Sequence, residues 1–132
     1  MKELTVEEKA TIIGEGYAIL SDIWGPRFTT VTLSVKRGGY TATAWVEKML
    51  IEIRADCWRK MGLCARRLVM VHESLHLVDW KHGSDSLYGN GVPDIASLQM
   101  YREIWGEDDE FKRTEERVRG AVSASLRTMR QG

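Results

Sequence analysis

The chain is predicted to fold as one α+β domain over residues 1–132, in which a twisted, mostly antiparallel sheet packs on helices. Three observations lead to this prediction. The first segment has the helical period, the next segments alternate between apolar and polar residues as strands do, and the second half returns to the helical period. No repeat, low-complexity tract or linker divides the chain. Its length supports one hydrophobic core but not two.

An amphipathic helix is expected first, over residues 5–24. Thr5 and Glu8 have the spacing of a capping box, in which each side chain accepts a hydrogen bond from the backbone N–H of the other residue. Apolar residues follow at the helical period, and Gly25 and Pro26 end the helix because neither residue continues one readily.

Three strands are expected next. Residues 28–37 and 40–46 are rich in β-branched residues that alternate with others, and Gly38 and Gly39 between them are typical of a hairpin turn. Residues 49–53 form a further apolar run of strand length. The pattern therefore predicts an antiparallel hairpin followed by a third strand.

Three helices are expected in the second half, at about residues 64–78, 94–105 and 109–129. Residues 82–93 are rich in Gly, Ser, Asp and Asn and are predicted as a loop, the kind of segment that often carries function. The turn that begins at Gly106 breaks the second of these helices and caps the third.

The charge balance argues against two classes of partner. The chain has 19 basic and 19 acidic residues, so it offers no electrostatic footprint for nucleic acid or for an anionic membrane. No apolar run approaches the ~20 residues that cross a bilayer, and the N-terminus lacks the apolar core of a signal peptide. These absences predict a cytoplasmic protein, although the sequence leaves export by another route open. The two cysteines, Cys57 and Cys64, do not have the spacing of a zinc or redox motif, and a single bridge between them is left open. Low cysteine usage favours a reducing compartment.

The strongest functional signal is the HExxH motif that runs from His72 through Glu73 to His76. Residues four apart lie on one face of a helix, so both imidazoles can reach one ion. Neutral imidazole is a good ligand for Zn²⁺. Glu73 lies beside the first histidine, where it can take a proton from the attacking water. The motif therefore predicts a zinc site with His72 and His76 as ligands and Glu73 as the general base.

The same motif also occurs by chance in ordinary helices. Here the chain has only three histidines, and all of them fall between His72 and His82. The motif also interrupts an apolar helical face, where buried imidazoles and a carboxylate are costly unless they are paired or bind metal. Both features favour the metal site over coincidence.

Two residues are candidates for the third metal ligand. His82 completes the pattern H-E-x-x-H-x5-H, which resembles the metzincin spacing except that Asp79 stands where that family has glycine. Asp85 instead begins the segment D-x-x-Y-G, which contains Tyr88 and ends at Gly89. We favour Asp85, because the segment that follows it and the flanking sequence agree with one family pattern.

With this segment after HExxH, the sequence resembles the aspzincins, the family of deuterolysin and peptidyl-lysine metalloendopeptidase. Their signature is HExxH followed by a G-T-x-D-x-x-Y-G loop, and the resemblance covers about residues 49–105. It implies a small zincin-like domain with an HExxH active-site helix. It also implies that His72, His76 and Asp85 bind Zn²⁺ and that Tyr88 donates a hydrogen bond to the oxyanion.

The resemblance further implies that Leu50–Ile53 is an edge strand to which a substrate adds as a further strand. The chain departs from the family in two places. Gly83 and Ser84 directly precede Asp85, so the G-T pair is shifted. The acidic motif that gives some members a preference for lysine is replaced by the segment 98–105, so that specificity does not carry over.

The function expected from these observations is that of a zinc-dependent endopeptidase acting on a protein or peptide substrate. Two alternatives stay open. The spacing of His72, His76 and His82 also resembles that of three-histidine metal-dependent endoribonucleases, but Glu73 and the zero net charge argue against that reading. A non-catalytic, zinc-stabilised module that binds a protein is the other alternative, and Glu73 together with an open fourth coordination position argues against it.

Overall fold

A computed structural model of the chain describes residues 4–25, 30–78 and 91–131. This part contains five α-helices, a short 3₁₀ turn and a three-stranded sheet, so the predicted mixture of helices and strands is confirmed. The elements in chain order are α1 (Val6–Trp24), β1 (Thr32–Lys36), β2 (Ala42–Trp45), η2 (Val46–Lys48), β3 (Leu50–Arg54), α2 (Ala55–Lys60), α3 (Leu63–Val78), α5 (Gly91–Trp105) and α6 (Asp109–Gln131).

The sheet has the order β1-β3-β2, with β1 parallel and β2 antiparallel to β3. The predicted hairpin between the first two strands is therefore wrong, and the sheet is mixed rather than mostly antiparallel. Ile51 and Ile53 explain the order, because both side chains of β3 are fully buried and the central position buries a strand most completely. The connection that contains Gly38 and Gly39 must cross the end of β3, about 10 Å or two strand spacings, which a tight turn cannot span.

The main hydrophobic core lies between α1, α3 and one face of the sheet. Leu33, Ile51 and Ile53 supply the buried side chains of that face. A Cβ on Gly16 of α1 would stand 2.7 Å from Cδ1 of Leu33, so glycine at this position lets the helix lie close to the sheet.

The start of α1 follows the sequence prediction. The Glu8 N–H donates to Oγ1 of Thr5 at 3.0 Å, and the Thr5 N–H donates to Oε1 of Glu8 at 3.2 Å, which completes the capping box. Hydrogen bonds from Thr5 hold the pKa of Glu8 below its usual value. The helix ends at Trp24, and Gly25 follows with a positive φ of 66°, a conformation that glycine adopts without strain.

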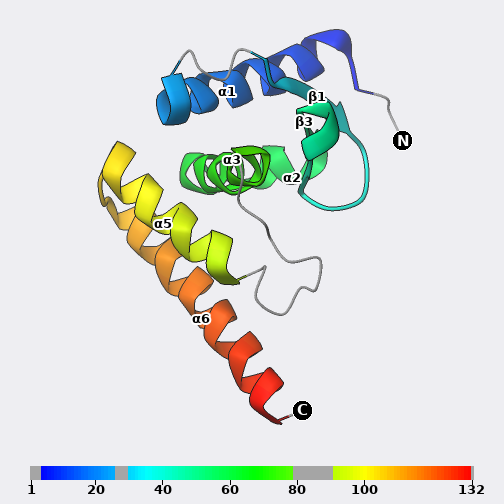
Figure 1. Ribbon diagram of the computed structural model, residues 1–132. Coiled ribbons are helices and arrows are strands. Elements are labelled where there is room, and N and C mark those ends of the chain that lie inside the picture. Colours follow the sequence, from blue (N-terminus) through cyan, green and yellow to red (C-terminus); the bar gives the residue numbers. More distant parts are fainter. Residues whose placement is uncertain (1–3, 26–29, 79–90, 132) are drawn as a thin grey trace.

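Helix α3 is the central element of the fold. It lies between α1 on one side and α5 and α6 on the other (Figure 1). A second, smaller cluster of buried residues joins it to the two C-terminal helices, with the Tyr101 and Phe111 rings stacked at 4.7 Å between centroids. The Arg67 guanidinium lies 4.7 Å from the ring centroid of Trp105. Helix α3 therefore contacts α1 and the sheet as well as the two C-terminal helices.

Two helices, α2 and α5, differ from the sequence prediction. Helix α2 is not among the predicted elements; it follows β3 directly and buries Trp58 completely. Helix α5 begins at Gly91, three residues before the predicted start at Asp94. Pro93 therefore lies in the first turn, where proline is tolerated because the backbone N–H groups have no partner within the helix.

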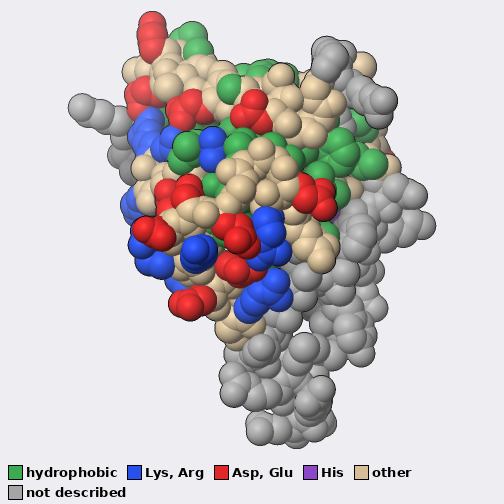
Figure 2. Space-filling view, turned by 90° about the vertical axis from the view of Figure 1, so that its left-hand side faces the viewer, with side chains coloured by type: hydrophobic (Ala, Val, Ile, Leu, Met, Phe, Trp, Pro, Cys, Tyr) green, Lys and Arg blue, Asp and Glu red, His purple; other side chains and the backbone are tan. Residues whose placement is uncertain are grey.

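Charged side chains of both signs are interspersed over the face of the molecule shown in Figure 2. Ion pairs lie near the junction of α5 and α6, where the Arg102 Nη2 lies 2.6 Å from Oε2 of Glu115 and the Arg102 Nε also pairs with Glu107. Exposed pairs of this kind contribute at most about 1 kcal/mol each. Among the described residues, no helix combines the length and the apolar character needed to cross a membrane.

Candidate metal centre

Helix α3 presents two different faces. Met70, Ser74 and Leu77 follow the helical spacing and are buried toward α1 and the sheet. The opposite face carries both histidines of the motif. Burial of the first face sets the rotation of the helix about its own axis. The two imidazoles consequently lie on the side away from α1.

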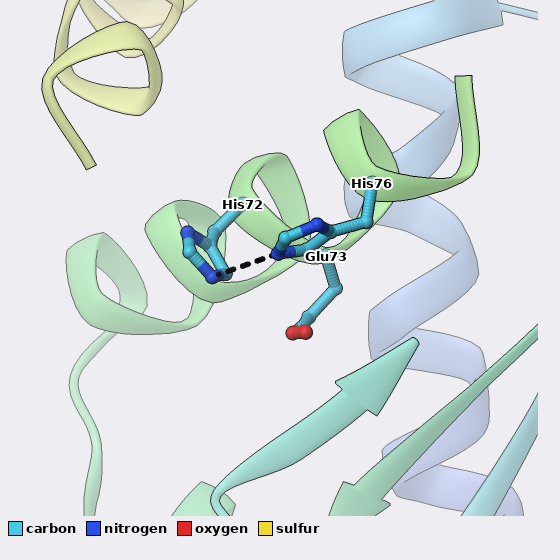
Figure 3. Close-up of side chains that lie close together, drawn as sticks. All are labelled: His72, Glu73 and His76. Atoms are coloured by element: carbon cyan, nitrogen blue, oxygen red, sulfur yellow. Dashed lines mark hydrogen bonds between the residues drawn. The ribbon is translucent and has the colours of Figure 1, made fainter. Parts of the chain in front are cut away.

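The two imidazoles lie one turn apart with their Nε2 atoms facing each other. The distance between Nε2 of His72 and Nε2 of His76 is 3.3 Å, and the rings stand edge to face at 84° (Figure 3). Both rings are partly exposed rather than enclosed in the core. This is the convergence that the four-residue spacing predicts for a helix.

The distance between the two nitrogens fits a shared zinc ion. In a tetrahedral site with Zn–N distances of about 2.0–2.1 Å, two ligand nitrogens are separated by about 3.3–3.4 Å. A hydrogen bond between two neutral imidazoles would also bring the nitrogens together, and 3.3 Å is slightly long for one. The two nitrogens thus fit zinc as ligands. A measurement of metal binding would distinguish a zinc site from a simple hydrogen bond between the two imidazoles.

Glu73 completes the cluster of groups that can hold a metal. One nitrogen of each imidazole and a carboxylate oxygen of Glu73 all lie within 4.8 Å of one another. The Glu73 side chain is only 7% exposed, and its carboxylate points toward the sheet side of the helix, below the two rings (Figure 3). Burial of a carboxylate is costly without compensating interactions, so its retention beside two imidazoles is consistent with a role at the site.

Ser74 anchors the motif on the opposite side of the helix. Its Oγ accepts a hydrogen bond from Nε1 of Trp24 at 2.8 Å and donates to the carbonyl oxygen of Val71 at 3.1 Å. Trp24 is the last residue of α1, 50 positions earlier in the chain. Sequence reasoning missed this contact, because no local signal pairs a serine inside HExxH with a distant tryptophan.

Of the predicted site residues, the structure brings together His72, Glu73 and His76. Asp85, His82 and Tyr88 lie outside the described residues, so their assigned roles stay predictions. Among the described residues, the group at the motif is the one set of at least three His, Cys, Asp or Glu side chains close enough to hold a metal.

The predicted edge strand is wrong. The segment Leu50–Ile53 belongs to β3, which pairs with β1 on one side and β2 on the other. Its backbone is therefore already hydrogen-bonded on both sides and cannot accept a further strand. Among the described strands, β2 is the edge on which α3 packs.

The two cysteines are free thiols. Cys64 is buried against α5 and α6, and burial raises the pKa of its thiol. Cys57 is partly exposed on α2. Neither belongs to the motif cluster.

No protein-family model, curated protein or solved structure matches the chain.

Proposed function

We propose that the chain is a zinc-dependent endopeptidase with a zincin-like site of the aspzincin type. The observation that carries the proposal is the convergence of His72, His76 and Glu73 within 4.8 Å on one helix. Two imidazoles at the spacing of tetrahedral ligands and an adjacent carboxylate supply two ligands and a base. The third ligand is proposed to be Asp85, with His82 as the alternative.

Each side chain has a defined part in peptide hydrolysis. The Nε2 atoms of His72 and His76 would hold the ion. When bound, zinc supplies a Lewis acid that polarises the scissile carbonyl and acidifies water. The Glu73 carboxylate takes a proton from the attacking water, whose oxygen bonds to the carbonyl carbon, and delivers that proton to the amine nitrogen as the C–N bond breaks. Tyr88 is proposed to donate a hydrogen bond to the oxyanion.

Strand β2 is the proposed docking edge for the peptide. The Arg54 N–H donates to the carbonyl oxygen of Thr41 at 2.8 Å, so these two residues form a hydrogen-bonded antiparallel pair. Because such pairs alternate along an antiparallel ladder, the backbone groups of Ala42 and Ala44 point away from β3. These groups are proposed to pair with a peptide that adds as a strand, and the Glu73 carboxylate lies on the sheet side of α3 (Figure 3).

Substitution Glu73→Gln tests the proposal. The amide keeps the shape of the side chain but cannot accept the proton, so peptide hydrolysis should fall by about 10²–10⁴-fold or more. Zinc content and thermal unfolding should stay close to those of the wild type. Hydrolysis of casein and of a quenched peptide library provides the assay.

Glu103→Gln is the matched control, because Glu103 is exposed on α5 and does not belong to the motif cluster. It should leave hydrolysis unchanged. If zinc-loaded wild-type chain hydrolyses no peptide at all, or if Glu73→Gln retains full activity, the endopeptidase proposal is wrong. Zinc binding without any hydrolysis would instead favour the alternative function, a non-catalytic zinc-stabilised module that binds a protein.

A further inference from the structure

A cavity adjoins the histidine face of α3. It has a volume of about 280 Å³, is partly open, and is lined by Ala65, Leu68, Val69 and His72 of α3, by Ser97 of α5 and by Thr114 and Val118 of α6. His72 belongs both to this lining and to the motif cluster. The cavity therefore adjoins one of the proposed metal ligands.

The lining of the cavity is mostly apolar. Apart from the His72 ring, its polar side-chain atoms are the hydroxyls of Ser97 and Thr114. The Thr114 hydroxyl donates to the carbonyl oxygen of Glu110 at 2.8 Å, so its proton is used within its own helix. Described residues place no carboxylate or ammonium group in the lining, and a charged side chain would lose its hydration there without an opposite charge in return.

The volume matches one large side chain. Engineered apolar cavities of about 150 Å³ stay dry and bind benzene, and small-molecule sites begin at about 300 Å³. A cavity of about 280 Å³ lies between these two limits. It therefore admits one aromatic or large aliphatic side chain, with room to spare, but not a whole peptide.

From these observations we infer that the cavity between α3, α5 and α6 is the specificity pocket for a large apolar side chain flanking the scissile bond. The inference rests on the proposed endopeptidase function. A peptide whose reacting carbonyl lies at the motif places a flanking side chain beside His72, and His72 also lines the apolar cavity. The chain accordingly cleaves next to Leu, Met or Phe rather than next to Lys or Asp.

The first experiment maps cleavage sites. Zinc-loaded wild-type chain is incubated with a proteome-derived peptide library, and the products are sequenced by mass spectrometry. Peptides identical except for the flanking position then compare Leu and Phe with Ala and Lys. Because a single methylene in an apolar pocket is worth about 10–200-fold, Leu and Phe should exceed Ala by at least about 10-fold in kcat/KM.

Narrowing the cavity should change this preference. Ala65→Leu adds three carbons to the lining on the α3 side and should reduce kcat/KM for Phe peptides by about 10-fold or more, with Ala peptides nearly unaffected. Val118→Phe narrows the cavity from the α6 side. This variant replaces Ala65→Leu in the same test if Ala65→Leu does not fold. Ala10→Leu is the matched control, because Ala10 is exposed on α1, and it should leave the preference unchanged.

Peptide binding separates the two proposals. In a Glu73→Gln background the same peptides, carrying a fluorophore, should bind with the order Phe and Leu over Ala and Lys, and Ala65→Leu should abolish that order. Selective binding without any cleavage by the wild type would support the pocket and contradict the endopeptidase function. Cleavage without apolar preference, or a preference that both narrowing variants leave intact, would overturn the pocket alone.

Discussion

The two faces of α3 differ in what surrounds them, although both belong to one 16-residue helix. The face toward α1 and the sheet is closed, with Met70 and Leu77 buried in the main core and the Ser74 hydroxyl hydrogen-bonded to Trp24. The opposite face is partly exposed, borders a cavity of about 280 Å³ and carries the two imidazoles.

The closed face of α3 therefore holds the helix in position, and the histidine face carries the groups proposed to act in binding and catalysis. A closed, well-packed face resists displacement because protein interiors are as dense as organic crystals. The imidazoles on the other side are consequently held at a fixed spacing while space remains beside them for an ion and a substrate. Substitutions on the first face should therefore affect stability, and substitutions on the second should affect metal binding and turnover.

Loss of the third metal ligand is expected to have the largest effect, because it would weaken zinc binding directly. If Asp85 binds zinc, Asp85→Ala should weaken zinc binding by more than the ~100-fold that loss of an outer-shell group costs, whereas His82→Ala should stay within that limit. Zinc titration against a competing chelator measures both variants on one scale. The reverse order would assign the ligand to His82 and favour the metzincin spacing.

Met70→Ala is the corresponding change on the closed face. Met70 is 0% exposed in the main core, and truncation of such a side chain costs about 2–5 kcal/mol of unfolding free energy. Denaturant unfolding of the metal-free chain measures the loss. Met100→Ala on α5, where the side chain is only half-buried, should cost less. Loss of zinc affinity in folded Met70→Ala, without loss of stability, would contradict the separation of the two faces.

A smaller effect is expected from the bond between α1 and α3. Ser74→Ala removes the acceptor of the Trp24 Nε1 hydrogen bond and should cost about 0.5–1.5 kcal/mol. A double-mutant cycle with Trp24→Phe isolates that bond from the packing of the ring. Both single variants should lose stability, and the double variant should lose less than their sum. A coupling energy of zero would show that the bond does not contribute.

The smallest effect concerns alkaline pH. Because burial raises the folded-state pKa of Cys64, the folded chain keeps the thiol proton at pH values where the unfolded chain has lost it. The contribution is fully present below the unfolded pKa of about 8.5 and is lost as pH rises through the folded pKa. Stability should therefore decline above about pH 8.5, and Cys64→Ala should decline less steeply over that range. An identical alkaline slope in both chains would contradict this assignment.

Features that depend on residues close together in the sequence could be predicted, whereas features that depend on residues far apart in the sequence could not. The capping box at Thr5 and the convergence of His72 with His76 follow from spacings of three and four residues, which helix geometry alone determines. The strand order did not follow, because a hairpin signal at Gly38 and Gly39 cannot reveal that the more apolar β3 takes the centre of the sheet. The contact between Trp24 and Ser74 and the cavity at His72 likewise depend on elements that only the folded chain brings together.

Zinc binding by the histidine face of α3 underlies every functional proposal above, and metal stoichiometry measures it. The purified chain is loaded with excess zinc, desalted and analysed for metal beside the double variant His72→Ala/His76→Ala, with circular dichroism to show that both are folded. We expect about one zinc ion per wild-type chain and none in the double variant. A wild-type chain that retains no zinc, or a double variant that retains as much as the wild type, would contradict it.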